Sequence, residues 1–435
     1  MPADRRAPRP GILVFEPDSN GHPLEWLRHL IRFAASDHRD YVLHLVIAPA
    51  LHPALAQDIA LVPEGRVRLI ALQPEEAARC THPKLTVSAF ARWRAMRRYL
   101  RATGAAAGYF LGLDHATLPL ALGLGFDGKR VGGILFRPST HYATIGQYRP
   151  DMRERLRDWR KAVLYRLMLA NRSLASVATL DPYFADFASH RYAGYTRIQA
   201  IGDPVPEMAP VAASNDPARA RTGFLLFGYL AERKGVMTTI EALHFLSKPV
   251  AASAAFLMAG AVDPQLRPRL MASIESLRVT RPDIHIRLDD RRIGDGELSQ
   301  CVADAGVILA PYRRFVGSSG VLLWAAQAGK PVITQEYGLL GRLLRDYRIG
   351  LAVDTDRPQA LAWAIERMVE EGPHRFFDPA AARAFLAGRT PRRFAADIID
   401  AALETARSSS LFSTHRNATA RPSLVTTTWS GTPPE

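Results

Sequence analysis

The sequence predicts an α/β protein of two domains, each a parallel β-sheet covered by helices on both faces. Short apolar segments alternate along the chain with segments whose apolar residues recur at helical spacing. A length of 435 residues suits two or three domains. The proline-rich stretch 202–220 separates two such series. We therefore expect domains at residues 1–204 and 205–388, a helix at 389–407 and a disordered tail at 408–435.

In the first half, a strand at residues 12–15 leads through a polar turn, 16–22, into a helix at 23–35. Pro23 suits the first helical position, because proline has no N–H to leave unpaired there. His22 ends the turn near the carboxyl end of the strand, where open α/β sheets bind ligands. A solvated loop histidine is the alternative. Further strands are expected at residues 41–47, 67–71, 108–113 and 131–136.

The second half begins a new series after the linker. Its predicted strands are residues 224–227, 255–259, 284–288, 306–310, 332–334 and 351–353. Its predicted helices are residues 235–246, 265–277, 295–303 and 358–371. A further helix is predicted to stop at Gly329.

Residues 310–335 form the most informative stretch, because a strand there runs into a basic loop and then a helix. The loop ends in the small residues Gly317, Ser318, Ser319 and Gly320, and the apolar Val321 opens the helix. A Gly/Ser turn that opens a helix leaves backbone N–H groups unpaired beside the positive end of the helix dipole, which favours a phosphate. An ordinary βα turn without a ligand is the alternative.

The formal net charge of +14 is uneven, since residues 1–200 carry +11 and the rest +3. A basic half indicates an anionic partner, which is nucleic acid, acidic lipid or a phosphorylated substrate. Cys80 and Cys301 are too few for a disulfide framework or a zinc site. We find no apolar run of transmembrane length and no signal peptide, so we expect a cytoplasmic protein, at most peripheral at the inner membrane.

Two predicted helices, residues 90–101 and 152–166, intersperse Arg and Lys with Trp, Leu and Tyr. This composition is typical of a helix lying on an anionic membrane surface. A solvated helix with arginine stems packed along it is the alternative. Membrane contact would use Arg92, Arg94, Arg97, Arg98 and residues 157–166. We expect no nucleic acid, because the aromatic residues sit at core spacing as often as at interfacial spacing.

Four segments of the second half together resemble a known family. They are FGYLAERKGVMTTIEAL (227–243), FLMAGAVDP (256–264), GELSQCVADAGVILAPY (296–312) and GSSGVLLWAAQAGKPVI (317–333). In this order, over residues 222–371, they are similar to the C-terminal domain of family 4 glycosyltransferases with the GT-B fold. The resemblance implies two Rossmann-like domains facing across a cleft, with the last helix crossing back to the first domain.

The resemblance also implies an activity. The C-terminal domain would hold a nucleotide diphosphate sugar, and a hexosyl group would pass, with retention, to a glycan, lipid-linked or small-molecule acceptor in surface glycan or glycolipid synthesis. Lys234 would neutralise the donor diphosphate, within a loop that includes Gly228 and Arg233, and residues 317–321 would cradle the phosphates. A loop cation beside a helix N-terminus stabilises a departing nucleoside diphosphate without a metal, so we expect neither metal nor cofactor. Asp354 and Asp356 we interpret as helix-capping residues.

Three positions depart from the family pattern. Val316 and Trp324 replace two glutamates that usually flank the phosphate loop, and Tyr229 stands where many relatives have arginine. These departures leave the donor sugar and the stereochemistry open. A non-catalytic binding or scaffold protein of the same fold is therefore the alternative.

On the acceptor side, the predicted catalytic residues are His22, Asp114 and His141, for acceptor binding or proton transfer. Asp114 follows the strand 108–113, and both Arg137 and His141 follow the strand 131–136. All lie at carboxyl ends of predicted strands, where parallel sheets form their sites.

Overall fold

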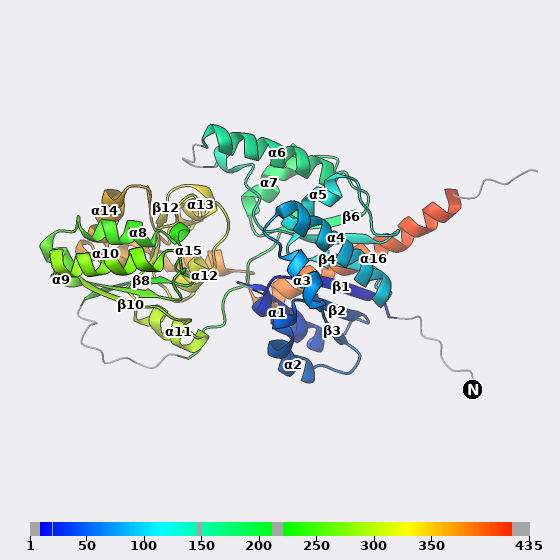
Figure 1. The fold of residues 1–435 in the computed structure, drawn as a ribbon, viewed down its shortest axis with the longest axis horizontal. Helices are drawn as coiled ribbons and strands as arrows, with labels where there is room; N and C mark the ends of the chain where they lie inside the picture. The colour runs from blue at the N-terminus through cyan, green and yellow to red at the C-terminus, as the bar shows by residue number, and fades with distance from the viewer. Residues whose placement is uncertain (1–8, 20, 146–149, 211–220, 420–435) are drawn as a thin grey trace, which may run out of the picture.

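The structure is a computed structural model that describes residues 9–19, 21–145, 150–210 and 221–419, with side chains as far as Ser409. It contains two parallel sheets, and helices flank each of them. The two resulting domains lie side by side (Figure 1). The first has seven strands in the order β3-β2-β1-β4-β5-β6-β7, and the second six in the order β10-β9-β8-β11-β12-β13. The predicted α/β architecture with two Rossmann-like domains is confirmed.

The first domain alternates strands and helices through Ala200. Its strands are β1 (Gly11–Glu16), β2 (Val42–Ile47), β3 (Val67–Ala71), β4 (Ala107–Phe110), β5 (Arg130–Leu135), β6 (Leu174–Thr179) and β7 (Ile198–Ala200). Its helices are α1 (Pro23–Ser36), α2 (His52–Ala60), α3 (Pro74–Cys80), α4 (Leu85–Thr103), α5 (Thr117–Ala121), α6 (Met152–Leu169) and α7 (Pro182–Arg191).

The second domain begins at Thr222. Its strands are β8 (Thr222–Phe227), β9 (Ala254–Ala259), β10 (His285–Asp289), β11 (Val307–Ala310), β12 (Val332–Gln335) and β13 (Gly350–Val353). Its helices are α8 (Val236–Leu243), α9 (Lys248–Ser253), α10 (Arg267–Thr280), α11 (Asp295–Asp304), α12 (Gly320–Gln327), α13 (Gly338–Tyr347), α14 (Pro358–Glu370) and α15 (Pro379–Leu386).

The continuous apolar runs of the sequence become central strands. In β1, residues 12–15 are at most 1% exposed, because helices cover both faces of the parallel sheet. The expected strand 108–113 is shorter, since β4 ends at Phe110 and a 3-10 turn, Leu113–Ala116, follows it.

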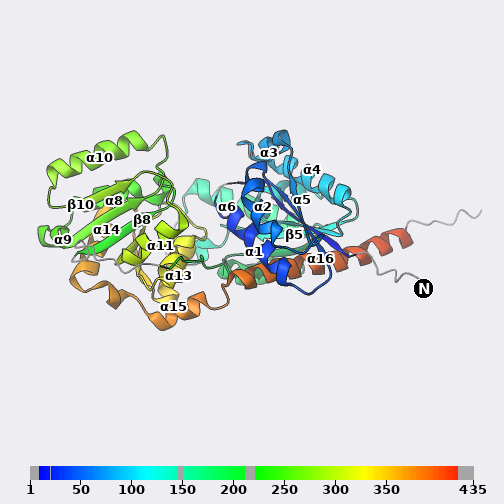
Figure 2. The same cartoon turned by 90° about the horizontal axis from the view of Figure 1, so that it is seen from below.

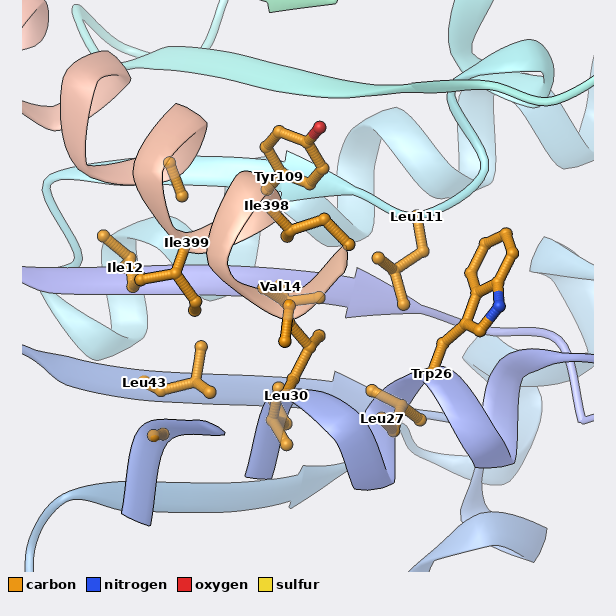
Figure 3. Packing of buried hydrophobic residues seen from close by; sticks show 14 of the residues in the cluster. Ile12, Val14, Trp26, Leu27, Leu30, Leu43, Tyr109, Leu111, Ile398 and Ile399 are labelled. Carbon is orange, nitrogen blue, oxygen red and sulfur yellow. The ribbon is translucent and has the colours of Figure 1, made fainter. Parts of the chain in front are cut away.

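The last helix, α16 (Pro391–Thr419), leaves the second domain and runs along the first (Figures 1 and 2). Ile398 and Ile399 pack in the same core as Ile12 and Val14 of β1 (Figure 3). The predicted crossover is confirmed.

The predicted end of this helix at residue 407 is wrong. Its hydroxyl-rich turns bond to the first domain: Thr405 Oγ1 lies 3.0 Å from Ser176 Oγ, and Ser409 Oγ accepts from Arg130 N at 3.0 Å. The tail expected to be disordered is thus helical as far as Thr419, and residues 420–435 lie outside the described residues.

Candidate active site between the two domains

The first loop of the site follows β8 and opens α8. Gly228 has φ +95°, and the Lys234 ammonium donates to the Phe227 carbonyl at 3.0 Å. Gly235, directly before α8, has φ +71°, and a Cβ there would lie 1.9 Å from the Pro311 carbonyl oxygen. Only glycine allows this approach, so the residue after Lys234 fixes the loop against the chain that leaves β11.

The second loop follows β11 and opens α12. Ser319 caps this helix by accepting from the Val321 N–H at 3.4 Å, and its hydroxyl lies 2.7 Å from the Tyr312 hydroxyl. The Lys234 ammonium lies 5.2 Å from the centroid of the same Tyr312 ring. The two predicted phosphate-binding loops therefore converge around one buried tyrosine.

Residues of the first domain face the second loop. A Cβ on Gly320 would lie 3.5 Å from His22 Cε1, and one on Gly317 would lie 3.6 Å from Arg137 Cγ. The His22 ring stacks on Trp26, with 5.8 Å between ring centroids. Ser318 Oγ donates to the buried Asp203 of the linker at 3.1 Å. His22 thus lies beside the start of α12, at the end of the second loop.

Positive charge gathers where the domains meet. Burial first, and the nearby charge of Arg233 second, lower the pKa of Arg137. Arg233 lies over the Phe315 ring at 5.6 Å. Across the described ranges of the chain, no carboxylate forms an ion pair with Arg137, Arg233 or Lys234. Three cations that pair with no carboxylate among the described residues make a site suited to a polyanion.

Asp114 has a positioning role in this arrangement. Its Oδ2 accepts from the Phe136 N–H at 2.6 Å and its Oδ1 from the Arg137 N–H at 3.1 Å. Both oxygens are thus engaged by the backbone that carries Arg137. Asp114 therefore holds the loop after β5 in place. This geometry favours a positioning role for Asp114 rather than the predicted role as an acid or base.

His141 does not line the site, so its prediction as a catalytic residue is corrected. Its side chain is fully buried, and its Nε2 lies 3.0 Å from Asp181 Oδ2. The Tyr142 hydroxyl donates to the same oxygen at 2.9 Å, and Asp181 also caps α7. The loop after β5 turns inward after Arg137, so His141 belongs to the support beneath the site.

Comparisons with known proteins identify the second domain. Residues 221–371 match the family described as "Glycosyl transferases group 1". This part of the chain is a group 1 glycosyltransferase domain. None of the curated proteins compared with the sequence matches it.

Solved structures show that the glycosyltransferase domain is part of a complete GT-B fold. Sucrose-phosphate synthase from Thermosynechococcus elongatus is 17% identical, with a TM-score of 0.59, covering 95% of this chain and 100% of that one. HepE of Anabaena in complex with UDP and glucose is 14% identical, with a TM-score of 0.58 and coverage of 92% and 99%. A Rickettsia africae glycosyltransferase is 11% identical, with a TM-score of 0.59 and the same coverage.

Positions where the glycosyltransferase domain departs from the family pattern lie beside its loops. The Trp324 ring makes an edge contact with Phe227, 6.3 Å between centroids, directly before the first loop. The Tyr229 hydroxyl donates to Asp263 at 3.0 Å.

The capping interpretation of Asp354 and Asp356 is wrong, because neither side chain caps α14, and Asp356 instead pairs with Arg313 at 3.0 Å.

Sequence reasoning missed two neighbouring carboxyl groups at the end of β1, the buried Glu16 and the half-buried Asp18. Glu16 is 4% exposed, and burial, with Asp18 nearby, raises its pKa to about 8. Asp18 forms a two-point ion pair with Arg92, at 2.8 and 2.9 Å. No residue pattern marks this cluster, because its members come from the end of β1, the loop after it and α4, and α4 is far away in the chain.

The ion pair between Asp18 and Arg92 corrects one residue of the predicted membrane contact through α4. Arg92 is 2% exposed and therefore cannot reach a surface. Arg97 pairs with Asp127, and Arg98 with Glu76 at 2.7 Å. The arginines of α4 other than Arg94 thus mainly hold the first domain together.

Proposed function

We propose that this protein transfers a sugar from a nucleotide diphosphate sugar to an acceptor hydroxyl. The observation that carries the proposal is the convergence of the loop 228–234 with the loop 317–320, opposite His22 and Arg137. Both loops open helices and so present backbone N–H groups to an anion. Structures of HepE with UDP and with UDP-glucose share this fold and support a nucleotide-sugar donor.

In the proposed reaction, the bond between the sugar C1 and the diphosphate oxygen breaks, and C1 forms a bond to the acceptor oxygen. The charge left on the nucleoside diphosphate is stabilised by Lys234, Arg233 and the N–H groups at the start of α12. Because these groups supply the positive charge, we propose that no metal is required. Retention of configuration is proposed from the family resemblance.

The acceptor is proposed to bind against the first domain, near His22 and Arg137. His22 carries a ring nitrogen suited to accept the hydroxyl proton. The acceptor class stays open among glycans, lipid-linked sugars and small molecules. We propose that the enzyme works in the cytoplasm, at an anionic membrane. No helix within the described residues is long and apolar enough to cross a membrane.

Binding and turnover test the proposal separately. Thermal unfolding is measured with UDP-, GDP- and TDP-sugars, since a ligand at 100 times its Kd adds about 2.7 kcal/mol of stability. Turnover of the stabilising donor is then measured with and without EDTA. Lys234→Ala should lower kcat about 100-fold or more, as loss of one preorganised donor to a developing charge does. Lys248→Ala, at an exposed lysine that opens α9, is the matched control.

Each negative result has its own meaning. Turnover that Lys234→Ala leaves unchanged contradicts the assigned role of that residue. Specific nucleotide-sugar binding without turnover favours the non-catalytic binding protein, as Val316 and Trp324 in place of carboxylates would suggest. Activity abolished by EDTA and restored by a divalent cation contradicts metal independence.

A further inference from the structure

Helix α6 has two apolar faces, and only one of them is used inside the protein. Tyr165, Met168 and Leu169 are at most 3% exposed, and Tyr165 packs edge-on against Phe184. A second set of large apolar side chains points to solvent: Met152 (77% exposed), Leu156 (58%), Trp159 (64%), Val163 (41%) and Leu167 (50%). We call these five residues the α6 stripe.

The α6 stripe is continuous along the helix. Its residues follow one another at intervals of three or four positions, so at 3.6 residues per turn they fall within an arc of about 80°. The buried residues lie on the opposite side of the helix. Since α6 has 18 residues, it is roughly 27 Å long at 1.5 Å per residue. An exposed apolar band of this length marks an interaction surface.

Positive charge borders the α6 stripe on both sides. On the same wheel, Arg155 and Arg166 lie along one edge, and Arg153 and Arg160 along the other. All four are exposed, whereas the acidic Glu154 and Asp158 are less exposed and lie toward the buried side. Apolar side chains, a central tryptophan and flanking arginines match the acyl boundary and the headgroups of an anionic bilayer.

Charge also argues against a second copy of this chain as the occupant. Two α6 stripes packed face to face would bring their flanking arginines together, and like charges at such an interface repel. An anionic lipid surface satisfies the apolar band and the arginines at once. We propose that α6 lies flat on an anionic phospholipid bilayer, with the α6 stripe buried in the interface.

This position connects the membrane to the site. Helix α6 lies along an outer edge of the first domain, with its first turn toward the second domain (Figure 1). Its capping residue Asp151 lies 3.9 Å from Arg314, in the loop after β11. On its inner face, Lys161 donates to Ser139 at 3.1 Å, two residues after Arg137. Docking through the outer face of α6 therefore brings the site to the bilayer surface.

Co-sedimentation of the full chain with lipid vesicles tests the docking, without donor or turnover. Vesicles of phosphatidylcholine alone are compared with vesicles that also contain phosphatidylglycerol. Leu156→Glu combined with Trp159→Glu should weaken binding to the anionic vesicles at least tenfold, because it places charges in the acyl boundary. Arg153→Gln and Arg160→Gln should each weaken it about fivefold at low salt.

Leu61→Glu combined with Val279→Glu is the matched control, since these side chains are 84% and 74% exposed on other elements. It makes the same change in charge and should bind vesicles like the wild type. Thermal unfolding with a nucleotide sugar shows that each variant is folded. It also keeps a failure of docking distinguishable from a failure of the proposed transferase function.

Three outcomes would overturn the proposal. One is equal recovery of the wild type with and without anionic vesicles. Another is unchanged binding in the Leu156→Glu/Trp159→Glu variant. The third is a wild-type dimer that this variant converts to a monomer without any vesicle binding, which would assign the α6 stripe to a second copy.

Discussion

The hydroxyl groups of Tyr312 and Ser319 lie 2.7 Å apart and join the chain leaving β11 to the cap of α12. The Tyr312 ring also lies beneath the Lys234 ammonium of the other loop. One side chain, 2% exposed, thus sets the distance between the two loops proposed to hold the diphosphate.

Tyr312→Phe keeps the ring and removes the hydroxyl. We expect a loss of about 1 kcal/mol in unfolding free energy, because one buried hydrogen bond disappears. Ser319→Ala should cost about 1 kcal/mol as a lost cap. The double variant should cost less than the two together, since both single changes remove the same bond. Urea unfolding of the four proteins measures this, and strict additivity would show that the two hydroxyls are not coupled.

Gly235→Ala should disrupt the first loop. The new Cβ would lie 1.9 Å from a backbone oxygen, so the chain must move, and we expect a loss of about 2 kcal/mol or more together with weaker nucleotide binding. Gly65→Ala is the matched control, because Gly65 has φ +75° but has no neighbour within 4 Å of a new Cβ. There only the backbone cost of about 1 kcal/mol applies. Equal losses in the two variants would contradict the close approach.

His22→Gln and His141→Gln separate a residue of the site from one beneath it. Because His22 faces Gly320, His22→Gln should lower kcat by about 100-fold, as loss of a general base does, with little change in stability. His141→Gln should lower the unfolding free energy by about 1–3 kcal/mol, because Asp181 loses a buried partner, and should change kcat only slightly. Kinetics and urea unfolding of each variant test this assignment, and the opposite pattern would restore His141 as the catalytic histidine.

Glu16 should make stability depend on pH in an unusual direction. Its pKa is about 8 in the folded protein, against 4.5 for an ordinary glutamate. Between these values the folded state holds a proton that the unfolded state has lost. Stability therefore falls as pH rises through this window, on the order of 1 kcal/mol per pH unit, and levels off above pH 8.

Glu16→Gln should remove this contribution and be the more stable protein at pH 8. Urea unfolding from pH 5 to 9 compares the two slopes. A wild-type protein that gains stability from Glu16 as pH rises would show that the carboxyl is ionised when folded.

Local patterns made most of the fold and the donor loops predictable. Continuous apolar runs such as residues 12–15 predict a buried parallel strand. Glycines beside a lysine or serine predict a turn that opens a helix. Short weakly marked elements such as β6 and β7 were missed, because β6 (LASVAT) consists mostly of small residues and β7 (IQA) is only three residues long. α13 and α15 were missed as well.

Contacts between distant elements were beyond sequence reasoning. The burial of Arg92 depends on Asp18, and that of His141 on Asp181, and neither pairing leaves a periodic trace. Arg137 was noted only as following β5, whereas its approach to Gly317 depends on how the domains meet. In α6, two apolar faces with arginines between them weaken the single-faced pattern by which an amphipathic helix is recognised.

The packing of Ile398 and Ile399 against β1 has a consequence for synthesis on the ribosome. Strand β1 cannot complete its core until Ile398 and Ile399 have been translated. At about 20 residues per second this delay is on the order of 20 s or longer. During that time β1 and its neighbours expose apolar surface that α16 later covers. We therefore expect the nascent first domain to bind chaperones, and a messenger truncated before residue 391 to yield a product that aggregates.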